Sequence, residues 1–285
     1  MRNSSFNLIK KCVVVFLVIV FALPALAQQP KAGKDQGTAA SSGKQPRQAK
    51  TPQEYADYNT AYANTGGEAM EKAANDFATK YPKSELRVYV YSKAMHEYQN
   101  ENNPAKMLAM GRKILTLDPD NTVALVLTAT VLADSLNDAD KDHDEKMDEI
   151  KVNADHALQT VDSSFVPPPQ ATPEQIADYK NTLQSMAHSA LGIMELKNGD
   201  DAGAEKDLKT AAELNKSQPD PYIWYHLALA QDHQKKYVEA LASVDQALHY
   251  TGSNPDLGKL AAGERERLAK LTGGSTPQPP PNTPK

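Results

Sequence analysis

The chain has 285 residues, of which 40% are hydrophobic, and a formal net charge of −5. This hydrophobic content is enough to build a core, so disorder along the whole chain is excluded. Residues 51–272 carry 22 Lys and Arg against 35 Asp and Glu, a net charge of −13, and such a surface repels the phosphates of nucleic acids and of anionic lipids. We therefore expect no nucleic-acid partner.

The N-terminal residues have the pattern of a secretory signal. Arg2, Lys10 and Lys11 precede the apolar residues 12–23, and the small-residue sequence Ala25-Leu26-Ala27 follows Pro24. We predict a signal peptide over residues 1–27, cleaved after Ala27, and a periplasmic or secreted protein. An uncleaved membrane anchor is the alternative, but the apolar run is shorter than the ~20 residues that a spanning helix needs. We expect no integral membrane segment once the signal is removed.

The only cysteine, Cys12, lies within this predicted signal. The mature chain would contain no thiol, which excludes disulfides, thiolate catalysis and cysteine-bound metals.

Two segments have the composition of disordered chain. Residues 28–50 are rich in Gln, Lys, Gly, Ser, Ala and Pro, contain no aromatic residue, and cannot bury enough apolar surface to offset chain entropy. Residues 273–285 form a Gly- and Pro-rich tail. We predict a disordered linker and a disordered tail around a folded region of residues 51–272.

Prolines divide the folded region at nearly constant intervals. Pro82 and Pro119 lie 37 residues apart, and Pro219 and Pro255 lie 36 residues apart, each after a helical pattern. Repeats of this length with a polar turn inside each unit are typical of stacked helix pairs. The pattern predicts an all-α solenoid of about five helix hairpins with a C-terminal capping helix.

Residues 221–250 carry the clearest unit. The residues that define its pattern are Trp224, Leu227, Ala228, Ala240, Leu241, Ala247 and Leu248. In these positions the unit resembles the tetratricopeptide repeat (TPR) family. Small residues at such places let two helices approach closely, and the large ones fill the space between adjacent pairs. We expect units at residues 51–83, 84–120, 121–162, 173–219 and 220–255, a cap at residues 256–272, and an inserted loop near residues 163–172.

The resemblance also implies which side chains line a concave groove, because TPR units present certain places of their first helix to a bound peptide. In this sequence those places hold Tyr55, Asn59, Tyr62, Tyr89, Ser92, His96, Gln99, Tyr222, Tyr225, Asp232 and His233. We interpret His226 and His233, seven residues apart, as polar groove residues rather than metal ligands.

An acidic segment offers one alternative function. Asp138, Asp140, Asp142, Asp144 and Glu149 have the spacing of carboxylates in a calcium-binding EF-hand loop. His143 stands where that loop needs a glycine for its turn, so an acidic loop between helices is the competing interpretation.

The sequence favours an interaction scaffold over an enzyme. The motifs of metalloproteases, serine hydrolases and dinucleotide-binding proteins are missing from it, and no cofactor is expected. We expect a non-enzymatic scaffold of the bacterial cell envelope that binds a neutral to basic protein or peptide. A calcium-responsive structural protein and an enzyme with an unrecognised site remain the alternatives.

Overall fold

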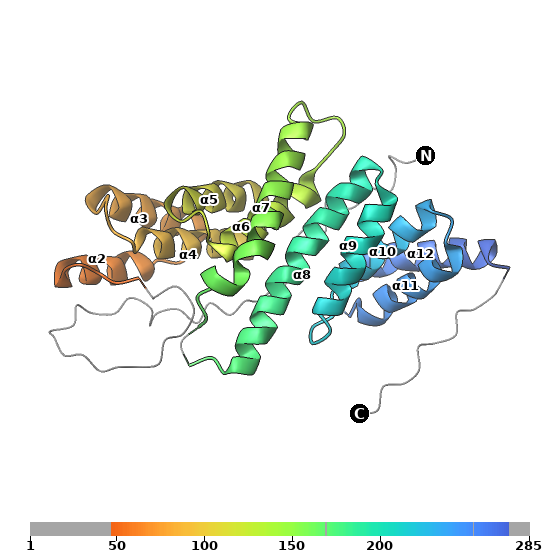
Figure 1. The fold of residues 1–285 in the computed structure, drawn as a ribbon. Helices are drawn as coiled ribbons and strands as arrows, with labels where there is room; N and C mark the ends of the chain where they lie inside the picture. The colour runs from red at the N-terminus through yellow and green to blue at the C-terminus, as the bar shows by residue number, and fades with distance from the viewer. Residues whose placement is uncertain (1–46, 169, 253, 274–285) are drawn as a thin grey trace.

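The computed structural model describes residues 47–168, 170–252 and 254–273 (Figure 1). The predicted signal peptide, residues 28–46 of the predicted linker and residues 274–285 of the predicted tail lie outside the described residues. The helices are α2 (Pro52–Tyr62), α3 (Gly67–Lys80), α4 (Arg87–Asn100), α5 (Pro104–Leu117), α6 (Thr122–Ser135), α7 (His143–Ser164), α8 (Pro173–Asn198), α9 (Asp201–Leu214), α10 (Pro221–His233), α11 (Tyr237–Tyr250) and α12 (Pro255–Leu271).

Each helix packs against the next one in the chain, and α8 also packs against α6. The pairs α2/α3, α4/α5, α6/α7, α8/α9 and α10/α11 are therefore successive hairpins, with α12 against α11. In Figure 1, α2 to α5 form one side of the array, α7 and α8 run obliquely across its middle, and α9 to α12 form the other side. The predicted all-α solenoid with a final capping helix is confirmed.

Short polar residues and prolines begin most of these helices. In α2, α5, α8, α10 and α12 a proline occupies the first turn, where its missing N–H costs no hydrogen bond. The preceding Thr or Asn or Asp accepts a hydrogen bond from a backbone N–H of the same turn. Pro173 thus begins α8, after the loop that the sequence predicted as an insertion.

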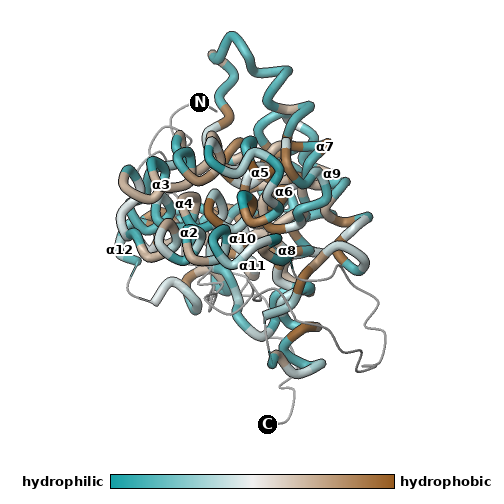
Figure 2. Tube along the Cα trace, turned by 90° about the vertical axis from the view of Figure 1, so that its left-hand side faces the viewer, coloured by the Kyte–Doolittle hydropathy of each residue, from teal (hydrophilic) through white to brown (hydrophobic). Residues whose placement is uncertain are grey.

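The core consists of two apolar clusters that meet at α6. One cluster extends from α2 to α6 and the other from α6 to α12. Leu127 and Val131 of α6 belong to the first cluster, and Val126 and Leu132 belong to the second. A helix that is apolar on all sides must be covered on all sides, which explains why α6 lies inside the array. In Figure 2 the loop that protrudes at the top is mostly teal, and brown, hydrophobic stretches run along the packed part of the chain.

Small residues bring the helices of a hairpin together, as the repeat pattern predicted. Ala228 of α10 and Ala240 of α11 are both fully buried. Trp224 is only half-buried, although the sequence led us to expect it between adjacent helix pairs. Its ring packs against the edge of the second cluster, so it covers the core rather than filling its centre.

Candidate functional site

Tyrosines from the first two hairpins gather around one buried ring. Tyr58 of α2 is 2% exposed, and its ring centroid lies 5.4 Å from that of Tyr62 and 6.5 Å from that of Tyr89 on α4. Tyr55 packs against the same apolar cluster. Tyr55, Tyr62 and Tyr89 are half-buried, so each ring keeps part of its surface accessible. We call these three residues the tyrosine surface.

Burial controls the chemistry of these phenols. It raises the pKa of Tyr62 to about 12, and it raises the pKa of Tyr89 as well. Both side chains are therefore neutral hydroxyl groups at physiological pH, able to donate and to accept hydrogen bonds. The Nζ atom of Lys93 lies 4.8 Å from the Tyr62 ring centroid and donates to the Tyr62 carbonyl oxygen, 2.5 Å away. This cation fixes the edge of the surface between α2 and α4.

The polar positions predicted from the sequence lie on these same two helices. Asn59 of α2 is exposed, and Ser92, His96 and Gln99 of α4 are half-buried. The Nε2 atom of His96 lies 3.5 Å from Nδ2 of Asn100. Their role in binding a partner stays a prediction.

The last hairpin does not offer the same surface, because the capping helix engages it. Tyr225 is 3% exposed and belongs to the core, so its assignment to an accessible groove was wrong. Nδ2 of Asn254 donates to the Tyr222 hydroxyl over 2.8 Å, and the guanidinium of Arg267 lies 2.6 Å from Oδ2 of Asp232. Asn254 caps α12 and Arg267 lies on it.

The two histidines of α10 also have partners within the chain. Nδ1 of His233 lies 2.8 Å from Oδ1 of Asp201. His226 is 4% exposed, and its Nδ1 lies 2.9 Å from the Tyr222 carbonyl oxygen. Burial lowers the pKa of His226 to about 4, so the ring is a neutral hydrogen-bond donor. The interpretation of His226 as a polar groove residue was wrong, since it is a buried structural residue.

The acidic segment does not close into a cation-binding loop. Helix α7 begins at His143, which puts Asp144 and Glu149 on a helix instead of a turn. The Nζ atom of Lys146 lies 2.8 Å from Asp140 and 2.9 Å from Asp142. Arg112 forms two hydrogen bonds with Glu149, and the Asp138 side chain is 70% exposed. Three of the five carboxylates, those of Asp140, Asp142 and Glu149, thus have lysine or arginine partners. Calcium binding by this segment stays a prediction that the structure does not favour.

Residues 47–50 depart from the predicted linker, because they pack on the hairpins. Arg47 donates its backbone N–H to the Tyr89 hydroxyl over 3.1 Å, and its guanidinium is paired with Asp118 at the end of α5. Ala49 is 5% exposed. The backbone N–H of Lys50 donates to Oε2 of Glu54 over 2.8 Å. We call residues 47–50 the strap.

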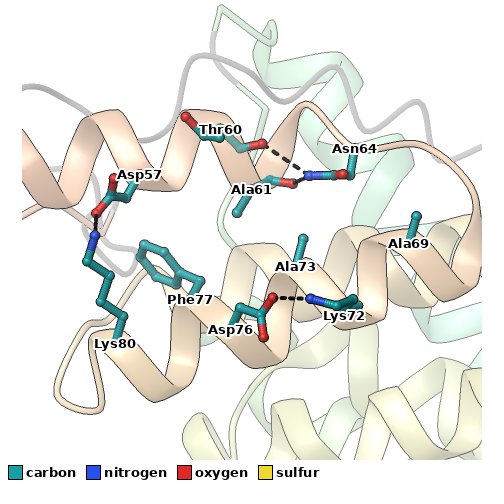
Figure 3. Close-up of a pocket in the computed structure, with 10 residues that line it drawn as sticks. All are labelled: Asp57, Thr60, Ala61, Asn64, Ala69, Lys72, Ala73, Asp76, Phe77 and Lys80. Atoms are coloured by element: carbon teal, nitrogen blue, oxygen red, sulfur yellow. Dashed lines mark hydrogen bonds and ion pairs between the residues drawn. The ribbon is translucent and has the colours of Figure 1, made fainter.

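A separate groove of about 400 Å³ opens between α2 and α3 (Figure 3). Ala61, Ala69, Ala73 and Phe77 contribute its apolar lining. Its charged residues pair with one another, since Lys80 contacts Asp57 and Lys72 contacts Asp76.

A carboxyl pair lies between α8 and α9. Burial and the neighbouring carboxylate of Asp207 raise the pKa of Glu195 to about 7, with Asp200 adding to the effect and Lys151 of α7 opposing it. Nδ1 of His188 lies 2.8 Å from Oδ1 of Asp207. The Glu195 carboxyl group is therefore mostly protonated below about pH 7 and mostly ionised above it.

This pair predicts the pH dependence of stability. An unfolded Glu195 titrates near 4.5, so between pH 4.5 and about 7 the folded chain binds more protons than the unfolded chain. The contribution of Glu195 to the free energy of unfolding therefore falls as the pH rises through this window. We expect Glu195→Gln to be more stable than the wild type at pH 8, by about 1 kcal/mol after screening by solvent, and to lose this advantage near pH 4.5.

Urea denaturation at pH 4.5 and pH 8 measures the effect. Glu213→Gln, an exposed change on the neighbouring helix α9, is the control and should give no pH-dependent difference. If the free energies of unfolding of Glu195→Gln and wild type differed by the same amount at both pH values, the raised pKa of Glu195 would be contradicted.

Among the described residues, no helix is both long and apolar enough to cross a bilayer. Within the same residues, no three His, Asp or Glu side chains gather in a way that could hold a metal ion.

The sequence pointed to Tyr55, Tyr62 and Tyr89 but missed the residues that organise them. Tyr58 lies three residues after Tyr55 and four before Tyr62, a spacing that places it close to both on a helix. Nothing in the sequence pattern linked Asp118 to Arg47, which lies 71 residues away.

Comparison with known proteins gives few matches. No family model matches this chain, and no curated protein matches it. Among solved structures, the chain is similar to TTC0263, a thermophilic TPR protein in Thermus thermophilus. That similarity covers 74% of this chain and 98% of the other, at 15% sequence identity and a TM-score of 0.46. By the packing of its own helices, the described part of the chain is an all-α solenoid of helix hairpins.

Proposed function

We propose that this chain is a non-enzymatic scaffold of the bacterial cell envelope that binds a partner polypeptide on the first helices of its N-terminal hairpins. The observation that carries the proposal is the tyrosine surface, in which Tyr55, Tyr62 and Tyr89 surround the buried Tyr58. Tyrosine offers a large amphipathic contact area and loses little rotamer entropy on binding, which is why it is enriched in interfaces.

The charge of the chain supports a particular class of partner. Residues 51–272 have a net charge of −13, which attracts cationic polypeptides over long range and repels nucleic acids. The partner is therefore a neutral to basic protein or peptide, and its association should slow as added salt screens the attraction.

The location follows from the pattern of residues 1–27. Their basic start, apolar stretch and Ala25-Leu26-Ala27 ending support export through a cleaved signal peptide, so the scaffold would act in the periplasm or outside the cell.

Removing the two half-buried rings that flank Tyr58 should abolish most of the binding. Interface tyrosines that act as anchors each contribute more than ~1 kcal/mol, so Tyr62→Ala combined with Tyr89→Ala should weaken capture of the partner by about 10-fold to 100-fold. The measurement is affinity capture by the tagged, exported protein from envelope extracts, with the captured protein quantified by mass spectrometry.

Val238→Ala is the control, because Val238 is a 47% exposed apolar residue on α11, far along the chain from the tyrosine surface. Thermal melting curves of the double tyrosine variant and of Val238→Ala establish whether both proteins are folded. Undiminished capture by a folded double variant would remove the tyrosine surface as the binding site.

A further inference from the structure

The strap lies against the hairpins, and every second side chain is partly or fully buried. Its side chains alternate, since Arg47 and Ala49 face the hairpins and Gln48 and Lys50 are exposed. Alternation with a period of two is what an extended segment shows when one side lies against a surface. Its backbone is held at both ends, by the Tyr89 hydroxyl at Arg47 and by Glu54 at Lys50.

The arginine of the strap occupies a defined subsite. Only 20% of the Arg47 side chain and 9% of the Asp118 side chain are exposed, so their ion pair is partly desolvated. Exposed ion pairs contribute little, but an arginine paired with a carboxylate away from water gains both strength and geometric selectivity. Asp118 thus selects a guanidinium, and Tyr89 fixes the backbone next to it.

The rest of the strap adds a second kind of selectivity. Ala49 is 5% exposed and belongs to the apolar cluster that contains Tyr58, and close packing at a buried position disfavours a larger side chain. The Nζ atom of Lys50 donates to the Lys83 carbonyl oxygen over 3.1 Å, at the exposed edge. The surface therefore fits an extended segment with an arginine, a small residue two places later and a basic residue after it.

The negative charge of the folded region favours binding of a basic segment, whether that segment belongs to this chain or to another protein. Residues 28–50 carry five Lys and Arg against one Asp, whereas residues 51–272 have a net charge of −13. The attraction that holds the strap would act equally on a basic segment of another protein.

We propose that the strap occupies, within the same molecule, a binding site for an extended basic peptide, and that a partner must displace residues 47–50 to reach Asp118 and Tyr89. This inference rests on the proposed function, because Tyr89 belongs to the tyrosine surface. Beyond the proposed function, it assigns a guanidinium-binding subsite to Asp118 and identifies the partner segment as extended and basic. It also states that this segment competes with residues 47–50 for the same surface.

The effect of the strap on the apparent affinity for a free peptide can be predicted. A segment tethered by a few residues acts at an effective concentration of about 1 mM or more, so a free peptide with micromolar affinity is largely excluded while the strap is bound. Loosening the strap should then increase the apparent affinity for a free peptide by about 10-fold or more.

The test uses the full mature chain and a labelled synthetic peptide with the sequence of residues 44–51, Lys-Gln-Pro-Arg-Gln-Ala-Lys-Thr. Fluorescence anisotropy measures its binding. Arg47→Ala in the chain releases the arginine of the strap but leaves the site intact, so this variant should bind the peptide at least about 10-fold more tightly than the wild type.

Changes in the peptide keep the test independent of folding. A peptide with alanine at the position of Arg47, or with glutamate at the position of Ala49, should bind the Arg47→Ala chain at least about 10-fold more weakly. Combining Arg47→Ala with Asp118→Asn in the chain should remove the preference for arginine. Arg265→Ala is the matched control. It also removes an arginine from an ion pair, but its partner is Asp245 and both residues are far along the chain from the strap. Peptide binding by this variant should equal that of the wild type.

Two results would overturn the inference: equal peptide binding by the wild type and by Arg47→Ala, or binding that does not depend on the arginine of the peptide. If either occurs while the tyrosine variants still lose the native partner, the strap inference fails and the proposed function stands. If the peptide behaves as expected but the tyrosine variants capture normally, the proposed function fails instead.

Discussion

Gly192→Val should lower the free energy of unfolding by about 3 kcal/mol, because it places a branched side chain between two helices in contact. Gly192 lies on α8, and a Cβ atom there would be 2.7 Å from Cγ of Leu208. It would also be 3.2 Å from the Ala204 carbonyl oxygen and from the Leu208 backbone nitrogen. Backbone atoms cannot rotate away, so α9 would have to shift as a whole.

Urea denaturation followed by far-UV circular dichroism measures this loss. Gly263→Ala is the matched control, because Gly263 lies on α12 with nothing within 4 Å of an added Cβ. The free energy of unfolding of the control should rise by about 0.5–1 kcal/mol, since glycine within a helix is unfavourable compared with alanine. A loss below about 0.5 kcal/mol in Gly192→Val would mean that α8 and α9 are not in close contact.

Leu132→Ala should cost about 3–4 kcal/mol of unfolding free energy. Leu132 is fully buried on α6, the helix at which the two apolar clusters meet, so the removed atoms would leave a cavity surrounded by packed side chains. The midpoint of urea denaturation should fall while the slope with denaturant stays unchanged.

Val152→Ala provides the comparison, because Val152 is a 63% exposed apolar residue on α7. The free energy of unfolding of this variant should lie within about 0.5 kcal/mol of the wild-type value. If Leu132→Ala destabilised the chain no more than Val152→Ala, the central position of α6 would be wrong.

The fold was predictable because its signals are local. Prolines at the first turns, small residues such as Ala228 and Ala240, and the apolar run of α6 each specify a helix or a close helix contact without reference to distant residues. The lengths of α7 and α8 follow from the helical patterns on both sides of the loop before Pro173.

The site was predictable only where it depends on one helix. The resemblance to TPR units selected Tyr55 and Tyr62, both on α2, and helical spacing could have added Tyr58 between them. At the last hairpin the repeat pattern failed, because the contact of Asp232 with Arg267 depends on how α12 packs. Composition also failed at the strap, since the burial of Ala49 depends on a cluster built by distant helices.

Site-specific photo-crosslinking from Asn59 tests the central claim most directly. Asn59 is exposed on α2, one turn from Tyr55 and from Tyr62, so a photoreactive side chain there should not disturb the core. In the exported, mature protein we expect a distinct crosslinked partner from position 59 that disappears with Tyr62→Ala and Tyr89→Ala, and no such product from position 238 on α11. The same products from both positions, or a product at position 59 that survives loss of both tyrosines, would contradict the account.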